Sequence, residues 1–375
     1  MLLIGLMSGT SLDGIDAALV RCSRTHPPTL IETTGLSMPA SLRQTLWSLC
    51  HAEELTFTAL ARAEEQFCQL QAQAVVALLE KSGLRAELVA AIGSHGQTIE
   101  HRPEGSYPYT CQLDNPSRLA ELTGCNVVGD FRRRDIAAGG QGAPLAPAFH
   151  EALFRDAHGW RVLLNLGGFA NLTILPPLDG ETPPEQRVVT GFDTGPANAL
   201  MDGWYARHHD GHFDTDGAWA ATGRCLPGLL DRLLSDPFFS RPPPKSTGRE
   251  HFNADWLDRH LAGEPAQDVQ ATLAALTVES VARALSRALP ADALTQASLI
   301  PCGGGAHNRY LMARLAERIA PLEVVPCETL GWSPDWLEAG AFAWLAWRRL
   351  QNLPGNAPTV TGAAGSRVLG GLYHS

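Results

Sequence analysis

The chain has little of what marks membrane-bound or nucleic-acid-binding proteins. Only 18% of its 375 residues are charged, and acidic residues outnumber basic ones by 39 to 29, for a formal net charge of −10. That balance argues against a generic nucleic-acid or anionic-membrane surface. No apolar run is long enough to cross a bilayer, and the first residues, Met1–Ile4, lack the basic region of a signal peptide. We therefore expect a cytoplasmic protein with neither nucleic acid nor membrane as a partner.

Paired cysteines are also missing. The eight cysteines are scattered and form no Cys-x-x-Cys pair. This pattern favours free thiols in a reducing compartment over a disulfide framework or a zinc site. The hydrophobic content of 45% is enough for sizeable cores, and 375 residues predict two domains or one large domain with two lobes.

A glycine-bearing turn near the N-terminus is the first stretch that indicates chemistry. Gly5–Asp16 lies between two apolar segments, Leu2–Ile4 and Ala17–Val20, which predicts a β-hairpin. Its Gly, Ser and Thr residues expose backbone N–H groups with little side-chain bulk, and such a concavity suits phosphate. Asp13 and Asp16 could hold Mg²⁺ beside that phosphate. The alternative is an ordinary tight turn.

A second polar turn follows a short apolar strand predicted at Leu88–Ile92. In open α/β sheets, ligands collect at the carboxyl ends of strands. His95 and Gln97, in the turn 93–98, are therefore candidates to hydrogen-bond a polar substrate. The alternative for His95 is a structural histidine.

Three arginines, Arg132 to Arg134, precede another glycine-rich segment, Gly139–Pro144. A guanidinium binds carboxylate or phosphate with two parallel hydrogen bonds, although not all three arginines can face one ligand. The alternative is a solvated cluster paired with Asp130 and Asp135.

The middle of the chain repeats the apolar–glycine–apolar pattern. A strand at Trp160–Asn165 leads into a second glycine hairpin, 166–174, which suggests an internal duplication. A further strand, 188–192, leads to Asp193 and a helix at 199–205. We expect the dipole at the N-terminus of that helix to favour an ionised Asp193, which could accept a proton or bind a metal. The alternative for Asp193 is a helix cap.

Three later features complete the candidate set. Lys245, Ser246 and Arg249 form a basic, turn-rich loop that could touch phosphate, or could be an ordinary surface loop. The glycine run 303–305 after a strand at 298–302 would let a nucleotide base or ribose lie against the backbone, although such runs also serve close packing. Glu338 is an acid in an apolar helix and needs a partner or a ligand, or it complements the helix dipole. Helical spacing predicts helices at 39–49, 55–82, 119–123, 269–288, 309–319 and 336–347.

Taken together, these stretches resemble the anhydro-N-acetylmuramic acid kinase family from Gly5 to Leu372. The shared segments are GLMSGTSLDGID (5–16), GSHGQT (93–98), DFRRRDIAAGGQGAP (130–144), NLGGFAN (165–171), GFDTGPAN (191–198), PKSTGRE (244–250) and CGGGAHN (302–308).

The resemblance implies a two-lobed α/β fold of the actin-like ATPase type, built from a duplicated ribonuclease H-like unit, with ATP in the cleft between the lobes. We place the N-terminal lobe at 1–150, with 350–375 packed back on it, and the C-terminal lobe at 151–349. The implied reaction uses ATP and water to convert 1,6-anhydro-N-acetylmuramic acid into N-acetylmuramic acid 6-phosphate and ADP, in peptidoglycan recycling. We also expect Mg²⁺ as a cofactor and a homodimer.

The resemblance also implies residue roles. Asp193 matches the catalytic base, and Arg134 and Glu338 match positions that contact the sugar. The positions implied to bind ATP are the N-terminal turn (Gly9, Thr10, Ser11, Leu12, Asp13, Gly14, Ile15 and Asp16), the second hairpin (Gly167 and Gly168) and the late glycine run (Gly303, Gly304 and Gly305). The metal ligands stay unassigned.

The sugar chemistry makes a water-activating base reasonable, because O6 of the anhydro sugar is tied to C1 and has no proton to remove. Three alternatives remain: a kinase of the same fold that acts on a free hydroxyl, an ATP-driven conformational switch, and an ATP-free glycosidase that uses Asp193 and Glu338.

Overall fold

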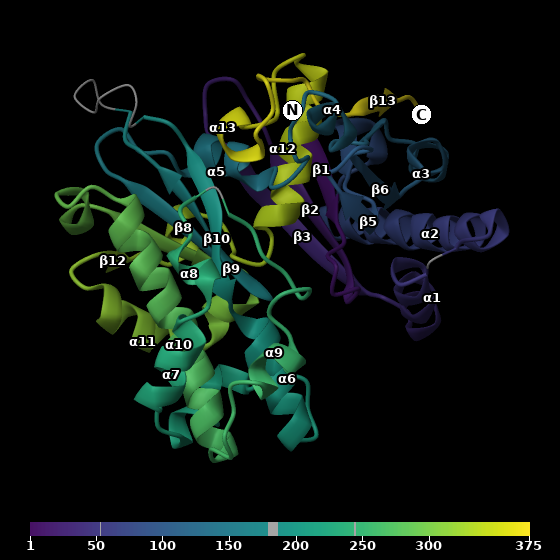
Figure 1. The fold of residues 1–375 in the computed structure, drawn as a ribbon. Coiled ribbons are helices and arrows are strands. Elements are labelled where there is room, and N and C mark those ends of the chain that lie inside the picture. Colours follow the sequence, from purple (N-terminus) through teal and green to yellow (C-terminus); the bar gives the residue numbers. More distant parts are fainter. Residues whose placement is uncertain (53, 179–186, 244) are drawn as a thin grey trace. The chain divides into compact units, whose positions relative to one another are not determined.

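The computed structural model describes residues 1–52, 54–178, 187–243 and 245–375 (Figure 1). The chain divides into two compact units. The first comprises Met1–Leu153 and Trp336–Ser375, and the second comprises Phe154–Asp335.

A six-stranded sheet with the order β13-β7-β4-β1-β2-β3 forms the centre of the first unit. Strands β1, β2 and β3 form an antiparallel meander, while β4 runs parallel to β1 and β7 parallel to β4. Strands β5 and β6 form a separate hairpin. The bounds are β1 (Leu2–Met7), β2 (Gly14–Arg21), β3 (Thr29–Ser37), β4 (Val89–Ser94), β5 (Gln97–Arg102), β6 (Tyr109–Leu113), β7 (Val127–Gly129) and β13 (Gly371–Tyr373).

Helices cover this sheet and enclose a core of buried residues such as Ile4, Leu19, Phe67 and Ile92. The long helix α2 begins at a Thr56 cap and ends at Gly83, whose φ of 66° suits a residue without a Cβ. The helices are α1 (Ala40–Cys50), α2 (Phe57–Ser82), α3 (Pro116–Thr123), α4 (Arg133–Ile136), α12 (Leu337–Leu350) and α13 (Pro358–Thr361); α5 (Ala146–Phe154) lies where the two units divide.

Helix α12 packs directly on β1 and β4, and two glycines make this possible (Figure 1). A Cβ on Gly5 would collide with the carbonyl oxygen of Ala339, and one on Gly93 with that of Phe342. Because of this close packing, α12 belongs to the first unit. The second unit therefore ends at Asp335, whereas we had placed the boundary at 349.

The second unit contains a five-stranded sheet with the order β10-β9-β8-β11-β12. Strands β8, β9 and β10 form an antiparallel meander, β11 runs parallel to β8, and β12 runs parallel to β11. The bounds are β8 (Arg161–Leu166), β9 (Phe169–Leu175), β10 (Thr190–Pro196), β11 (Ser298–Cys302) and β12 (Glu323–Val324).

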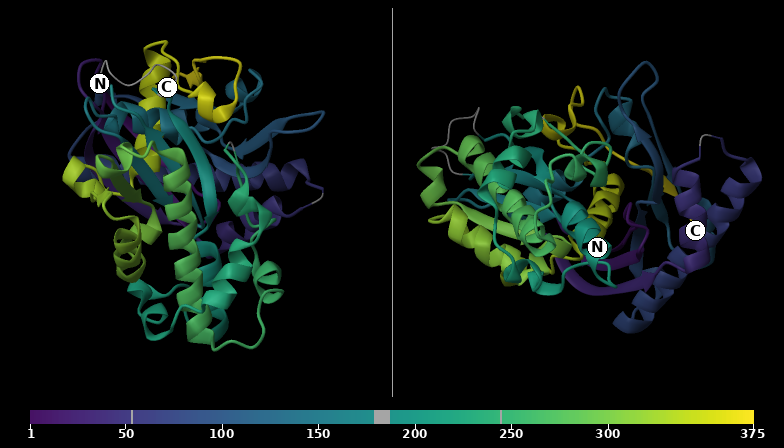
Figure 2. Two further views of the ribbon diagram at one scale, coloured as in Figure 1. Left: turned by 60° about the vertical axis from the view of Figure 1, so that its left-hand side comes forward. Right: turned by 60° about the horizontal axis from the view of Figure 1, so that its bottom comes forward.

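Helix α10 (Ala266–Ala288) is the main buried helix of this unit and packs against β10 (Figure 2). Its apolar face joins a core that includes Leu164, Leu172, Val281 and Leu299. The other helices are α6 (Asn198–His208), α7 (Pro227–Leu234), α8 (Pro237–Ser240), α9 (Ala254–Asp258) and α11 (Arg309–Ile319).

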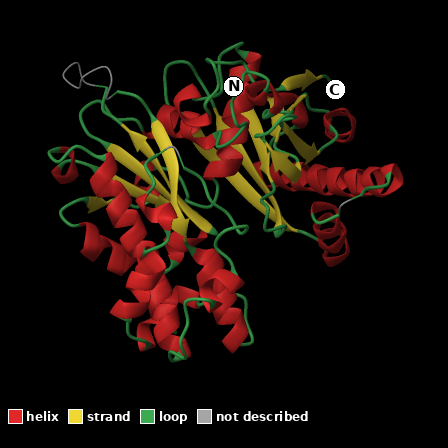
Figure 3. Ribbon diagram, in the orientation of Figure 1, coloured by secondary structure: helices red, strands yellow, loops and turns green. Residues whose placement is uncertain are grey.

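The two sheets repeat one topology. Numbering each unit's strands afresh, β3-β2-β1-β4-β7 and β10-β9-β8-β11-β12 both have the order 3-2-1-4-5, with three antiparallel strands followed by two parallel ones. In each unit, helices lie between the meander and the parallel strands in the sequence, and helices pack on the sheet (Figure 3). The predicted α/β fold with a duplicated unit is confirmed.

Most predicted helices lie where periodicity placed them, whereas some strands were missed. Strand β3 and the hairpin β5–β6 were not predicted. In β3, exposed and partly exposed residues alternate and none is fully buried, so the strand lacks the apolar run that we searched for. No helix among the described residues is long and apolar enough to span a membrane.

Candidate functional site

In the first unit, the turn after β4 forms hydrogen bonds with the N-terminal glycine turn. Ser8 Oγ donates hydrogen bonds to the Gly14 carbonyl oxygen (3.0 Å) and to Gln97 Oε1 (2.7 Å). Gln97 Nε2 donates to the Gly9 carbonyl oxygen at 3.2 Å. Gln97 is fully buried, and these contacts engage both ends of its amide. This geometry makes Gln97 a support for the turn, and a substrate contact for it stays a prediction.

His95 contacts the same turn and extends the network to an arginine. Its Nδ1 lies 3.1 Å from the Ser8 carbonyl oxygen, and its Nε2 lies 2.8 Å from Arg132 Nη2. Burial and the neighbouring Arg132 lower the pKa of His95 to about 3, so the ring is neutral at neutral pH. Neutral His95 therefore donates from Nδ1 to Ser8 and accepts from Arg132 at Nε2.

The arginine that the structure brings to this network is Arg132. Its Nη1 donates to the Gly142 carbonyl oxygen at 2.8 Å, and its Nε is buried without a hydrogen-bond partner among the described residues. Burial lowers its pKa to about 10, and Glu338 opposes that effect. Glu338 is an exposed residue by its whole surface, but burial of its carboxyl group raises its pKa, an effect that Arg132 partly offsets.

Arg134, our candidate from the resemblance, is not part of this cluster. It is exposed and lines a surface depression that Asp130, Arg133 and Arg349 also border. Helix α4 begins directly after Arg132. Residues 132 and 135 are three positions apart, so they lie on the same side of this helical turn, which faces the protein interior, whereas residues 133 and 134 are exposed. The structure therefore points to Arg132 as the arginine next to Glu338. The sequence contained this candidate, but nothing local distinguishes it from its two neighbours.

In the second unit, three predicted segments converge at one edge of the sheet. Strands β8 and β11 are parallel, so the turn after β8 and the glycine run after β11 lie at the same edge. Gly305 approaches Leu166 closely enough that a Cβ on it would lie 2.7 Å from the Leu166 Cβ. The Gly167 and Gly168 carbonyl oxygens accept hydrogen bonds from the N–H groups of residues 197–199 at 3.0–3.1 Å, which joins this turn to the start of α6.

Four of the candidate glycines leave room for a side chain. Apart from its neighbours in the chain and the backbone of its own helical turn, no described residue has an atom within 4 Å of a Cβ built on Gly304. For Gly9, Gly167 and Gly168 the first neighbours of such a Cβ lie at 3.5 to 3.7 Å, which is ordinary contact. Packing does not require glycine at these positions, so they are suited to a ligand that lies against the backbone. Gly303 is different, because it has a φ of 77° and its Cβ would collide with Asn165 Oδ1. Gly303 is therefore required by the backbone conformation and by packing, whereas Gly304 is a candidate to face a ligand.

Asp193 lies within β10, at an irregularity in its pairing with β9, and does not cap a helix. Its backbone N–H donates to the Lys245 carbonyl oxygen at 3.0 Å, and its Oδ2 accepts from the Thr247 N–H at 2.9 Å. No described residue donates a hydrogen bond to its Oδ1. Burial raises the pKa of Asp193 to about 6; the Thr247 N–H and Lys245 lower it, and Glu250 raises it further. The net shift is upward, so the surroundings of Asp193 disfavour its ionised form, and a contribution from the α6 dipole stays a prediction.

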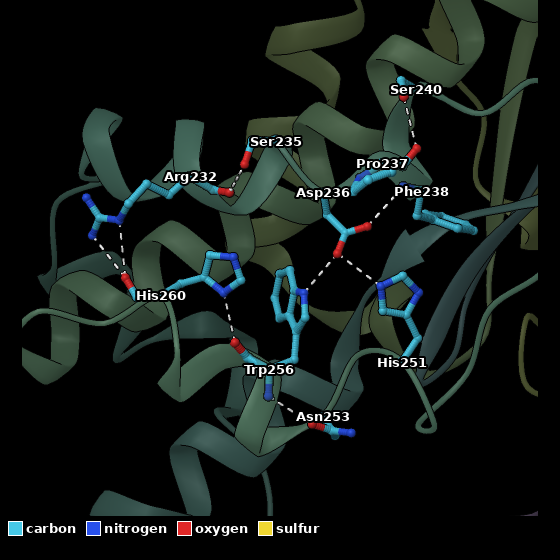
Figure 4. Close-up of polar contacts among 10 residues, drawn as sticks. All are labelled: Arg232, Ser235, Asp236, Pro237, Phe238, Ser240, His251, Asn253, Trp256 and His260. Carbon is cyan, nitrogen blue, oxygen red and sulfur yellow. Dashed lines mark hydrogen bonds and ion pairs between the residues drawn. The ribbon is translucent and has the colours of Figure 1, made fainter.

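The segment 245–251 contacts Asp193 through Lys245 and Thr247. At its far end, His251 contacts the largely buried carboxylate of Asp236 (Figure 4). Asp236 Oδ2 accepts from Trp256 Nε1 and lies 3.0 Å from His251 Nε2, while its Oδ1 accepts from the Phe238 N–H. Burial alone would raise the pKa of Asp236, but these hydrogen bonds hold it below its usual value. The sequence did not suggest Asp236 and His251, because they are 15 residues apart and lie in no glycine motif.

Lys245 does not present its ammonium to a ligand beside Asp193. It is buried and donates to the Phe238 carbonyl oxygen at 3.0 Å. Ser246 and Arg249 are exposed, and a phosphate contact for them stays a prediction.

A metal site built from protein side chains alone is absent from the described part of the chain, where no three His, Cys, Asp or Glu side chains group closely enough to hold an ion. Asp13 lies on the N-terminal turn with an exposed carboxylate, 3.6 Å from Arg43. A single carboxylate suits Mg²⁺ when nucleotide phosphates and waters provide the other ligands. The residues present therefore fit a magnesium ion that arrives with a nucleotide.

The duplicated 3-2-1-4-5 sheets, with glycine turns at the strand ends, have the α/β arrangement expected of the actin-like ATPase and sugar kinase fold. The model of one family, anhydro-N-acetylmuramic acid kinase, matches residues 1–375. The chain is 59% identical over 373 residues to the enzyme of that name from Chromohalobacter salexigens, covering 99% of both chains. It is 49% identical over 375 residues to that of Pseudomonas putida, again covering 99% of both. The chain belongs to the anhydro-N-acetylmuramic acid kinase family.

Proposed function

We propose that this chain is an ATP-dependent kinase that opens 1,6-anhydro-N-acetylmuramic acid with water and phosphorylates O6, giving N-acetylmuramic acid 6-phosphate and ADP. We place this activity in peptidoglycan recycling in the cytoplasm, and we propose a homodimer as the working form. Family membership over the whole chain supports the reaction. The observation that carries the mechanism is Asp193, a half-buried carboxylate that has one oxygen tied to Thr247 and the other without a donor among the described residues.

Asp193 is suited to be the base that activates water. Its pKa of about 6 leaves it ionised at neutral pH while making it a stronger base than an ordinary aspartate. Oδ1 is available to accept a proton from water, and the Thr247 N–H fixes the orientation of the carboxylate through Oδ2. Thr247 Oγ1 is buried without a described partner, which leaves a second polar atom for a bound water or sugar hydroxyl.

The bond changes balance with one base. The water oxygen forms a bond to C1 as the C1–O6 bond breaks, and the water proton passes to Asp193. O6 forms a bond to the γ-phosphorus, and the bond from that phosphorus to the β–γ bridging oxygen breaks to release ADP. Asp13 is the candidate residue to hold Mg²⁺ when a nucleotide is bound, and the ion would supply neutralisation of the phosphoryl charge. The turn at Gly9 and the turn at Gly168 each offer backbone N–H groups of the kind that bind phosphate.

We propose Arg132 and Glu338 as the polar groups of the first unit that orient the sugar. Arg132 has a buried Nε without a hydrogen-bond partner among the described residues, and the Glu338 carboxylate is close enough to Arg132 for their charges to interact. The lactyl carboxylate of the sugar is a natural partner for a guanidinium. Arg134 remains a weaker candidate because its side chain points away from this cluster.

The test is incubation of the purified protein with ATP, Mg²⁺ and the anhydro sugar, followed by mass spectrometry. We expect a product heavier than the sugar by one phosphoryl group and one water. A product that forms without ATP would support a glycosidase, and ATP hydrolysis that is independent of the sugar would support a conformational switch. Either result would contradict the proposal.

A further inference from the structure

A cavity beside β10 is not used by the proposed reaction. It offers about 50 Å³ of space for water and is lined by residues of β10, of α10 and of the segment after α8. Phe192 and Thr194 of β10 line it, whereas Asp193, the residue between them, is not among its lining residues. The candidate base is therefore not part of this cavity.

Four basic side chains line this small cavity, namely Arg241, Lys245, Arg283 and Arg287. Arg283 is already neutralised, because its Nε donates to Glu279 at 2.9 Å. The other three have no acidic side chain in ion-pair contact among the described residues. Such a concentration of positive charge is unexpected in a chain with a net charge of −10.

The three remaining cations are held in place by neutral groups. Arg287 Nη1 donates to the Phe239 carbonyl oxygen at 2.8 Å, and Lys245 Nζ donates to the Phe238 carbonyl oxygen at 3.0 Å while lying 4.4 Å from the centre of the Phe238 ring. These contacts orient the charges without cancelling them. Burial and repulsion from Arg287 and Arg241 lower the pKa of Lys245 to about 8, and the negative charge of Asp193 partly offsets this effect.

From this cavity and its three cations that form no ion pair among the described residues, we propose that the pocket between β10 and α10 is a binding site for a small tetrahedral oxyanion of the phosphate class. Two guanidinium groups and an ammonium are the donors that phosphate prefers. One water needs about 10–15 Å³ of such space, so the cavity admits one phosphate-sized group but not a whole sugar ring. Arg241 and Arg287 are exposed and Lys245 is buried, so the anion would enter past the arginines.

The site has a direct connection to the candidate base. The carbonyl oxygen of Lys245 accepts the Asp193 N–H, so the residue that contributes an ammonium to the anion site also fixes the backbone of Asp193. The existence of the site does not depend on the proposed function, since the test below measures binding without turnover.

The experiment is titration of the full-length protein with inorganic phosphate at constant ionic strength, followed by calorimetry and by the melting temperature. The test variant is Arg241→Gln/Arg287→Gln, and the control is Arg259→Gln, an exposed arginine of the same unit that lies outside the cavity. We expect the Kd for phosphate to rise by about tenfold or more in the test variant and to stay unchanged in the control. The variant Arg241→Lys/Arg287→Lys, which keeps the charge, should retain binding even if the glutamine variant folds poorly.

A parallel titration with glucose 6-phosphate shows whether the site prefers free phosphate or a sugar phosphate. From the size of the cavity, we predict that inorganic phosphate binds more tightly than glucose 6-phosphate. Equal binding of phosphate to the wild-type protein and the glutamine variant would place the anion elsewhere, for example at the glycine turns. That result, absence of phosphate binding to the wild-type protein, or a preference for the ester would overturn the proposal.

Discussion

At Asp193, burial and hydrogen bonding act in opposite directions on one carboxylate. Burial favours the protonated form, whereas the Thr247 N–H favours the charged form, and burial dominates, so the pKa is about 6. The same balance that makes the carboxylate a useful base also makes its charge costly to the folded state. Function and stability should therefore respond oppositely when the charge is removed.

We predict that Asp193→Asn keeps the fold and lowers kcat by about 10²- to 10⁴-fold, with little change in KM, because the amide can still accept the Thr247 N–H but cannot take a proton. The wild-type rate should fall as the pH decreases through about 6, where Asp193 becomes protonated. Asp202→Asn is the matched control, since Asp202 is also partly buried with a pKa raised to about 6 by burial and by Asp214. Steady-state kinetics over pH 5–8 measure both effects. Near-normal turnover by Asp193→Asn would place the base elsewhere.

The same substitution should stabilise the protein at alkaline pH. Because the folded-state pKa of Asp193 lies above its ordinary value of 3.8, the folded state prefers the protonated form, and ionisation above about pH 6 costs stability. Asp193→Asn should therefore have a higher free energy of unfolding than the wild-type protein at pH 8, and the difference should shrink as the pH falls below 6. Denaturant titrations at pH 8 and pH 5 measure it. A less stable variant at pH 8 would mean that the carboxylate is stabilised by contacts stronger than its burial.

A comparison of two neighbouring arginines tests the assignment in the first unit. Arg132→Gln should lower kcat/KM by about 10²-fold or more, because a charged hydrogen-bond donor next to His95 and Glu338 is lost. Arg134→Gln should stay within a few fold of the wild-type protein, since this side chain is exposed. Arg132→Lys and the melting temperatures of all three variants separate lost function from lost folding. The reverse order of effects would restore Arg134 as the substrate contact.

At the scale of elements, local sequence patterns predicted where helices and turns lie in the sequence better than they predicted which elements pack together. Periodicity located α2, α10 and α12, and the glycine turns lie where the strands predicted them. The position of α12 on β1 and β4 could not be predicted, because it depends on Gly5 and Gly93 approaching a helix more than 240 residues away in the sequence. The strand β10 continues through Asp193 because its partner β9 provides hydrogen bonds, which the short apolar run 188–192 does not reveal.

The glycine run after β11 provides a test at this scale. Gly304→Ala should leave the melting temperature unchanged, because no described residue beyond its own turn has an atom within 4 Å of the new Cβ. It should raise the KM for ATP by about tenfold if a nucleotide lies against that backbone. Gly303→Ala should instead lower the melting temperature, because its φ of 77° and the nearby Asn165 side chain leave no room. An unchanged KM for ATP in Gly304→Ala would move the nucleotide away from this turn.

At the scale of the whole molecule, the sequence predicted that one structural unit occurs twice, but it predicted the boundary between the two units only in part. Two glycine hairpins about half the chain apart indicated a repeated unit, and both sheets have the order 3-2-1-4-5. The C-terminal residues return to the first unit, but they do so from Trp336, not 350. The sequence did not single out Arg132 from its two neighbours and did not suggest the pair Asp236 and His251, because their importance depends on three-dimensional neighbours and not on a motif.

The most direct test of the central claim, that Asp193 drives water onto C1 while O6 accepts the phosphoryl group, is the reaction in ¹⁸O-labelled water, quenched early and analysed by mass spectrometry of fragments. We predict a sugar phosphate that carries one ¹⁸O atom on C1 and an unlabelled oxygen between C6 and phosphorus. Asp193→Asn should form this product at a much lower rate. A labelled oxygen at C6, or a phosphorylated sugar that contains no oxygen from water, would contradict the account.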